Sequence, residues 1–447
     1  MATELSTMPL RWTDFKVLLV ASLGQFLGQG LATLVGIMLP LIDISTGAGL
    51  PAPLQGLLGC ISLIGIMIGS AVIGNLVDRY GTLLLFRLCP LVCCLASLAV
   101  IIFPNVIVLL VSLFVIGFAI GGEYSLDPVY ISELMPDRWK TFMLGVAKAF
   151  ASAGSVVVAV ICYVILSHGI SAEKWAALMW IIFGLCALMF VLRLGFAQTP
   201  GWLFTHGKPL QAQKAVQKML GNDVVYDSEQ TSAPSPKKTA SVVRFLATHP
   251  RQVILTGLPW AFEGLGVYGI GIFLPALVMA FGLDFLPPEA SPMKHIINSV
   301  GLTFVLCVVM MIGFCTGLTV LRRFRHTSMQ IVGFCVSSAG LGLLLAAFLL
   351  HWPAWIAVSG FVIFELALNA GPHLITFILP SQVFGVADRG TGAGIAASLG
   401  KSGAVAGAFF IPVILHHLGA AGVLITSIIV MLLGAFVTLL FKKPYTP

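Results

Sequence analysis

Two carboxylates stand inside an apolar part of the chain, in the stretch GGEYSLDPVYISELMP from Gly121 to Pro136. Glu123 and Asp127 are four residues apart, which places both on one face of a helix. Counted from Pro136, Asp127 lies roughly 13 Å and Glu123 roughly 20 Å into such a helix. Because a carboxyl group away from water holds its proton more readily, this pair could bind and release protons near neutral pH.

Four more ionisable side chains lie within long apolar runs, namely Lys148, Glu263, Glu365 and Lys401. If the runs span a membrane, a charge near its centre costs at least about 2.5–3.5 kcal/mol, so each residue is a functional candidate. Lys148 matches Asp127 in depth, and Lys401 matches Glu263. Each match leaves two interpretations open: a structural ion pair between helices, or two charges available to protons and solute.

Uncharged side chains that could hydrogen-bond a solute share these runs: Gln25, Gln29, Tyr124, Trp260, Tyr268 and Asn369. We predict that they bind a solute together with Lys148, Glu365 and Lys401. Buried amides also bond across helices without any solute. We interpret His373, in the same run as Asn369, as structural.

The composition explains where such helices must lie. Of the 447 residues 58% are hydrophobic and only 9% are charged, whereas about one quarter of a soluble domain is charged. A membrane span needs roughly 20 apolar residues, and helices alone satisfy their own backbone in lipid. We therefore predict an all-α integral membrane protein with twelve transmembrane helices, at approximately 16–41, 54–76, 83–103, 106–134, 141–166, 175–193, 253–281, 296–320, 328–350, 354–380, 390–416 and 420–441.

Lysine and arginine are concentrated in alternate loops and at both termini. Such an excess marks the cytoplasmic side, so we predict cytoplasmic termini in a plasma (bacterial inner) membrane. Arg193 is counted here as a helix-end residue beside the long loop that follows the sixth span. The net charge of +7 is thus a topology signal, and we expect no nucleic-acid partner.

The chain divides into two related halves. Residues 1–193 and 251–447 are predicted six-helix bundles, joined by a loop over 194–250 with a short amphipathic helix (GKPLQAQKAVQKML) and a flexible linker (DSEQTSAPSPKK). Aligning 132–154 with 381–403 matches Gly145 to Gly394 and Gly154 to Gly403. Two pseudo-symmetric halves around a midplane site are typical of transporters.

Three motifs then occur in order at the loops: GNLVDRYG (74–81), PVYISELMPDRWK (128–140) and QTPGWLFTHGKPLQAQKAV (198–216). Together they resemble the major facilitator superfamily, more narrowly its sugar-porter-like and metabolite–proton symporter branch. The resemblance implies the major facilitator fold and alternating access. We expect Glu133 to pair with Lys140, Arg138 or Arg389. The predicted gating residues are Gly74, Asp78, Arg79, Gly81, Glu133, Arg138, Lys140 and Arg389.

The sequence departs from the branch's usual motifs at several positions. Thr82 and Leu83 stand where basic residues are usual, and Gln198 and Gly201 replace the acidic and basic residues of the third motif. These departures predict a weakened cytoplasmic ion-pair lock.

For proton coupling we select Glu123, Asp127 and Glu263. Glu123 has no partner of matching depth in the sequence, and the resembled proton symporters often carry a fourth-span acid in a similar Gly-Gly-acid-Tyr context. A structural or solute-binding role for Glu123 is the alternative.

The sequence thus predicts proton-coupled import of a small polar solute such as a sugar, an organic acid anion or phosphate. The lysines favour an anion and the loop motifs favour a sugar. A proton-driven exporter and a non-transporting solute sensor are the alternatives. An enzyme is not expected: GIAASLGKS (394–402) has its glycines one residue too far apart for a P-loop and lies in an apolar helix. The expected partners are the solute, protons and the bilayer, with no cofactor or metal and with the monomer as the working form.

Overall fold

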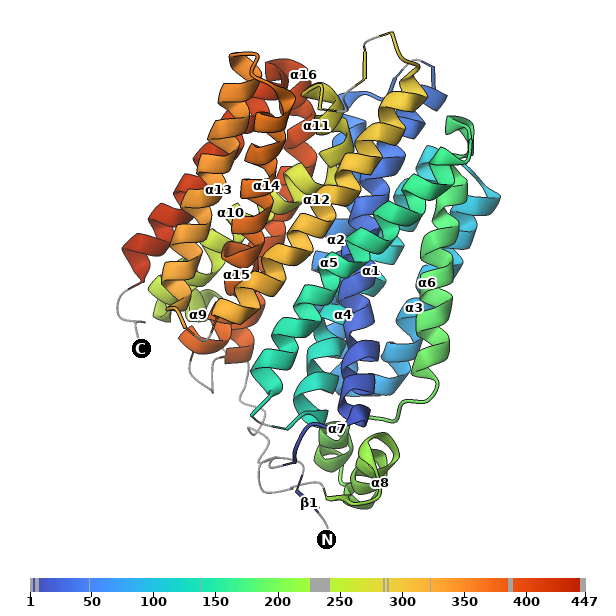
Figure 1. Ribbon diagram of the computed structural model, residues 1–447. Coiled ribbons are helices and arrows are strands. Elements are labelled where there is room, and N and C mark those ends of the chain that lie inside the picture. The colour runs from blue at the N-terminus through green and yellow to red at the C-terminus, as the bar shows by residue number, and fades with distance from the viewer. Residues whose placement is uncertain are drawn as a thin grey trace. The chain divides into compact units, whose positions relative to one another are not determined.

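The computed structural model describes residues 3–4, 8–47, 49–136, 138–225, 242–283, 286–287, 289–321, 323–384 and 389–442. Helices follow one another from α1 near the N-terminus to α16 near the C-terminus (Figure 1). The first part of the chain supplies α1 (Trp12–Ser45), α2 (Ala52–Tyr80), α3 (Thr82–Ile102), α4 (Val106–Leu134), α5 (Lys140–Ser167), the 3-10 helix η1 (Ala172–Leu178) and α6 (Met179–Arg193).

The segment after α6 holds shorter elements: α7 (Pro200–Thr205), α8 (Pro209–Leu220), β2 (Val224–Val225) and α9 (Val242–Thr248). The strand β2 pairs in parallel with β1 (Thr3–Glu4). Helix α8 confirms the predicted amphipathic helix, since it buries Ala212, Val216 and Leu220 and exposes Lys214 and Lys218. The predicted flexible linker, 227–238, lies outside the described residues.

The remainder supplies α10 (Pro250–Ile272), α11 (Leu274–Ala280), α12 (Pro292–Val320), α13 (His326–Leu349), α14 (Ala354–Ala370), α15 (Pro372–Val383) and α16 (Arg389–Phe441). In the part of the chain that the structure describes, 11 helical segments are long and apolar enough to cross a membrane. One of them belongs to α16, which has 53 residues and breaks at Gly419, where φ is 68°. Because that break divides α16 into two span-length pieces, the segments fit the predicted twelve-helix plan.

Contacts divide the chain into two compact units. Unit 1 contains residues Met1–Gly28, Ile64–Gly154 and Met179–Thr239, and unit 2 contains Gln29–Leu63, Ser155–Leu178 and Ala240–Pro447. The division into residues 1–193 and 251–447 rests on the sequence repeat and stays a prediction. Each unit encloses its own group of buried ionisable side chains.

Two glycines matched by the sequence repeat make the same kind of close contact. In unit 1, a Cβ atom on Gly154 of α5 would overlap the carbonyl oxygen of Phe26 in α1. In unit 2, a Cβ atom on Gly403 of α16 would overlap the carbonyl oxygen of Ala261 in α10. Small residues allow helix backbones to approach in this way in membranes. The two halves of the repeat therefore both need a glycine where one helix packs closely against the backbone of another.

We expect Gly403→Leu to destabilise the protein by at least about 1–3 kcal/mol, because the obstacle is backbone, which cannot rotate away as a side chain can. Gly394→Leu is the matched control: it lies on the same helix, is exposed, and has open space around its Cβ position. Thermal unfolding and monodisperse yield in detergent measure the effect. Equal stability of the two variants would contradict the close packing of α16 on α10.

Candidate functional site

A buried arginine joins the two carboxylates of α4. Arg193, the last residue of α6, is 0% exposed, and Glu123 is 1% exposed. The guanidinium donates to both carboxylate oxygens of Glu123, from Nη1 to Oε1 at 2.8 Å and from Nη2 to Oε2 at 2.7 Å. Its Nη2 also lies 3.5 Å from Oδ1 of Asp127. This bidentate geometry is the strong form of a charged hydrogen bond.

Helix α3 fixes the position of this arginine. The guanidinium of Arg193 lies 3.6 Å from the centre of the Phe86 ring, and its Nη1 donates to the Phe86 carbonyl at 2.8 Å. The neighbouring Arg87 donates to the carbonyls of Arg193, Leu194 and Phe196 at 2.7–3.3 Å. A cation at the C-terminal end of a helix complements its free carbonyls. At this end of the α3–α6 contact, each helix therefore contributes an arginine that binds backbone carbonyls of the other segment.

One sequence-based expectation about this site is wrong, because Glu123 does have a charged partner. Arg193 is the last residue of α6, as expected of a helix-end residue, but its side chain is buried. Depth counted along a helix could not identify this pair, because α6 ends at Arg193 and residues 194–199 are not helical.

Other predicted residues of unit 1 surround this cluster. A Cβ atom on Gly24 of α1 would overlap the side chains of Asp127 and Glu123, so the α1 backbone covers them, and Gln25 beside it is buried. Lys148 of α5 is buried, with Nζ 5.9 Å from the centre of the Tyr124 ring. An Asp127–Lys148 pair stays a prediction.

Glu133, at the end of α4, binds the start of α7. Its Oε2 accepts a hydrogen bond from the backbone N–H of Gly201 at 2.5 Å. A Cβ atom on Gly201 would lie only 2.8 Å from Oε2. The glycine that replaces a basic residue in the third motif is thus what allows the backbone to approach the carboxylate. The expected pairing of Glu133 with Lys140, Arg138 or Arg389 stays a prediction, and the backbone N–H is an additional partner.

The other departures from the motifs meet at one place, which we call the neutral contact: Gly81, Thr82 and Leu83 against Gln198 and Thr199. The Thr82 and Thr199 hydroxyls lie 2.7 Å apart, and the Leu83 N–H donates to Oε1 of Gln198 at 2.6 Å. Gly81 has φ 89° and lies directly beneath the Gln198 side chain, so both its backbone and its lack of a Cβ are needed. Uncharged hydrogen bonds stand where members of the branch usually carry charged residues.

Within the described residues, the structure shows no contact that tests the gating role of the remaining candidates. Gly74 is half-buried in α2, and Arg138 is exposed beside the Trp139 ring at 5.7 Å. The side chains of Asp78, Arg79 and Arg389 lie outside the described part of the structure. Their gating role stays a prediction.

Burial raises the pKa of Glu133 to about 7, and the Gly201 N–H and Lys140 offset only part of that rise. Between the ordinary pKa of about 4.5 and about 7, the folded protein holds a proton that the unfolded chain has lost, so stability falls as pH rises through this window. We expect the melting temperature of the wild type to drop, relative to Glu133→Gln, by on the order of a degree or two between pH 5 and pH 8. If the melting temperatures of the wild type and of Glu133→Gln in detergent change with pH in the same way, Glu133 does not have the raised pKa.

In unit 2, four buried polar side chains from three helices form a continuous row. Nε2 of His373 in α15 lies 3.7 Å from Oε1 of Glu263 in α10. Its Nδ1 lies 2.9 Å from Oδ1 of Asn369 in α14. Nδ2 of Asn369 lies 3.0 Å from Oε2 of Glu365. The structure therefore brings together three predicted site residues through a histidine that the sequence led us to regard as structural.

The other candidates of unit 2 lie on α10 and α16. Nζ of Lys401 donates to the Tyr268 hydroxyl at 3.1 Å and lies 4.7 Å from the ring centre. Trp260 packs on Gly400, where a Cβ would lie 2.6 Å from the indole. A Glu263–Lys401 pair stays a prediction.

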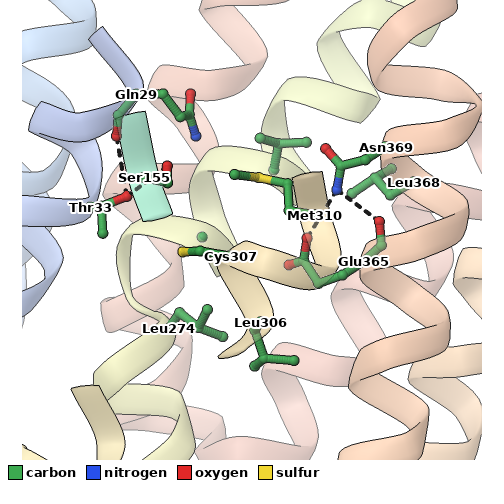
Figure 2. A pocket seen from close by; sticks show the side chains of 12 residues that line it. Gln29, Thr33, Ser155, Leu274, Leu306, Cys307, Met310, Glu365, Leu368 and Asn369 are labelled. Carbon is green, nitrogen blue, oxygen red and sulfur yellow. Dashed lines mark hydrogen bonds between the residues drawn. The ribbon is translucent and has the colours of Figure 1, made fainter. Parts of the chain in front are cut away.

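A small cavity lined by both apolar and polar side chains lies beside this row, and Figure 2 shows the side chains around it. Glu365 and Asn369 lie on one side of it, while Gln29, Thr33 and Ser155 lie on the other, with the Thr33 hydroxyl 2.9 Å from that of Ser155. Its volume is about 30 Å³, enough for water but not for a sugar. Thr33 and Ser155 were missed because isolated hydroxyl residues in apolar helices usually bond their own backbone.

Comparisons with known proteins agree with this architecture. The sequence matches the family described as "Sugar (and other) transporter" over residues 42–444. It is 23% identical to the inner membrane metabolite transport protein YgcS of Escherichia coli (strain K12), covering 90% of this chain and 85% of that protein. It is also 23% identical to the inorganic phosphate transporter PHO84 of Saccharomyces cerevisiae, covering 88% and 76% respectively.

Among solved structures, the major facilitator superfamily proton:xylose symporter XylE bound to 6-bromo-6-deoxy-D-glucose superposes with a TM-score of 0.74 at 16% identity. The likeness covers 97% of this chain and 96% of that one, and it shows the fold. The expected all-α major facilitator fold is confirmed. Since the family match also runs over most of the chain, this multi-pass membrane protein is a transporter and not an enzyme, and it belongs to the sugar (and other) transporter family.

Proposed function

We propose that this protein imports a small polar solute together with protons across a plasma (bacterial inner) membrane, by alternating access and as a monomer with both termini in the cytoplasm. Glu123, Asp127 and Glu263 are the proposed proton-coupling residues. The proposed solute ligands include Gln29, Glu365 and Asn369 at the cavity.

The observation that carries this proposal is the charge count of the cluster in unit 1. Two carboxylates, Glu123 and Asp127, face one guanidinium, that of Arg193, in surroundings closed to water. One proton on either acid leaves these three groups without net charge; the buried Lys148 of α5 would supply the second positive charge instead if it pairs with Asp127. Buried charge that is not balanced is expensive, so neutralisation by a proton favours the closed, dry arrangement that transport must pass through.

Coupling also requires that the proton be held differently in the two access states. Glu123 meets this requirement if it is ion-paired with Arg193 in one state and separated from it in the other. In the paired state the carboxylate is stabilised; once separated in a dry site, it takes up a proton.

The relatives narrow the solute class. The proteins matched are named for xylose with protons, inorganic phosphate and metabolites. The cavity contributes amides, hydroxyls and a carboxyl group, which suit a hydroxylated solute. As the solute we propose a sugar first, and an organic acid anion or phosphate second.

Uptake by proteoliposomes tests the proposal. A panel of radiolabelled sugars, carboxylates and phosphate is offered with an inward proton gradient, with no gradient, and with a reversed gradient. We expect one class to accumulate only with the inward gradient. Accumulation under the reversed gradient would identify an exporter, and binding without any flux would identify a sensor.

A further inference from the structure

In unit 2, one row of side chains fixes which imidazole nitrogen of His373 carries a proton. The row consists of Glu263, His373, Asn369 and Glu365. All four side chains are buried. The row joins α10, α15 and α14 within unit 2, and it ends at the cavity wall, where Figure 2 shows the bonds from Asn369 to Glu365.

The orientation of the Asn369 amide is fixed by a backbone group. Its Nδ2 lies 2.8 Å from the carbonyl oxygen of Glu365, and a carbonyl only accepts hydrogen bonds. The NH₂ group must therefore face Glu365, and Oδ1 must face His373. Since Oδ1 only accepts as well, the His373 Nδ1 atom at 2.9 Å carries a hydrogen.

It follows that Nε2 is the imidazole atom that gains or loses a proton. This atom lies 3.7 Å from Oε1 of Glu263, longer than a hydrogen bond but within the range of an ion pair. When the pair holds one proton, that proton is either on Nε2, giving imidazolium and carboxylate, or on Oε1, giving two neutral groups. When it holds none, the carboxylate faces a neutral imidazole.

The groups around this pair come from α12, α10 and α16. On α12, the centre of the tilted Phe314 ring lies 4.9 Å from that of the imidazole, and Cys307 lines the cavity beside Glu365. On α10 and α16, Tyr268 receives Lys401. Glu263 and Glu365 are thus the acids that the row places next to His373, directly and through Asn369.

We propose that Glu263 and His373 form a second proton-binding site, in which Asn369 and Glu365 act as positioning residues that keep Nε2 as the titrating atom. This replaces the interpretation of His373 as a structural residue. Binding takes one proton from water onto Nε2 or Oε1, and release returns it to water; no other bond changes. Its use in transport rests on the proposed function, but proton binding itself is measured independently of any solute.

Nuclear magnetic resonance of the full chain, labelled with ¹⁵N-histidine and held in lipid nanodiscs, tests the site directly. The signals of His373 are identified among the nine histidines by their loss in His373→Gln. We expect its Nδ1 to stay protonated while its Nε2 signal moves between about pH 5 and 8, the range in which histidine changes charge. In Glu263→Gln, the same signal is expected to stay at the neutral position throughout.

Two further variants separate positioning from packing. Asn369→Leu removes the acceptor at Nδ1, so a second tautomer with the proton on Nε2 should become populated. Glu173→Gln, an exposed carboxyl in the same unit, is the matched control and should leave the spectrum unchanged. A His373 signal that ignores both pH and Glu263→Gln would overturn the proposal. If His373 titrates but solute uptake does not depend on the proton gradient, the proton-binding site is supported. That outcome contradicts only the proposal of proton-coupled import.

Discussion

Replacing Arg193 by Met is expected to be among the most damaging single changes in the protein. It leaves Glu123 and Asp127 buried without their guanidinium. Removing one partner of a buried ion pair costs about 3–5 kcal/mol, because the remaining charge is neither hydrated nor paired. We expect Arg193→Met to lose most of its folded yield and to be measurably less stable in detergent.

Compensation distinguishes charge from packing in this experiment. The double variant Arg193→Met/Glu123→Gln removes one positive and one negative charge, so its stability should recover part of the loss. Arg251→Met, at an exposed arginine near the start of α10, is the control and should behave as the wild type. If the loss of stability in the double variant equals the sum of the losses in the two single variants, the Glu123–Arg193 ion pair does not hold α6 against α4.

Glu123→Gln is expected to abolish accumulation driven by a proton gradient while the protein remains folded. The change leaves one carboxylate, Asp127, facing one guanidinium, so the cluster stays balanced. Glutamine keeps the size and the hydrogen-bonding capacity but cannot bind or release a proton. The accumulation ratio should fall to that of passive equilibration, whereas counterflow exchange of the same solute, which needs no net proton movement, should continue.

The readout of this variant has its own control. Glu173→Gln, an exposed substitution, should accumulate solute as the wild type does, and wild-type vesicles with a collapsed gradient set the equilibration level. Continued accumulation in Glu123→Gln would move the proton site to Asp127 or to Glu263.

The helices and their order could be predicted because roughly 20 apolar residues in a row have few alternatives in lipid. The same holds for α8, whose apolar and charged residues alternate at helical spacing. The breaks at Phe273, Gly371 and Gly419 were less accessible, because a hydrophobic run looks the same whether or not its helix is interrupted.

Partner choice was harder to predict than position. Glu123 and Asp127 were identified from depth and spacing, but Arg193 was counted only as a helix-end residue that marks topology, as basic residues near span ends usually do. His373 and Glu263 are separated by 110 positions in the sequence, and their approach depends on how α15 lies against α10. Gly201 shows the opposite case: its departure from the third motif was visible, and the structure supplies the contact with Glu133 that explains it.

The neutral contact has a consequence for how the transporter responds to dissolved electrolyte. Ion pairs at a surface weaken as salt shortens the Debye length, to about 8 Å at physiological ionic strength. The Thr82–Thr199 and Leu83–Gln198 hydrogen bonds carry no net charge, so added ions do not screen them. If this contact closes one access route, the share of the closing free energy that these two hydrogen bonds supply stays the same when the internal salt concentration of a cell rises under osmotic stress.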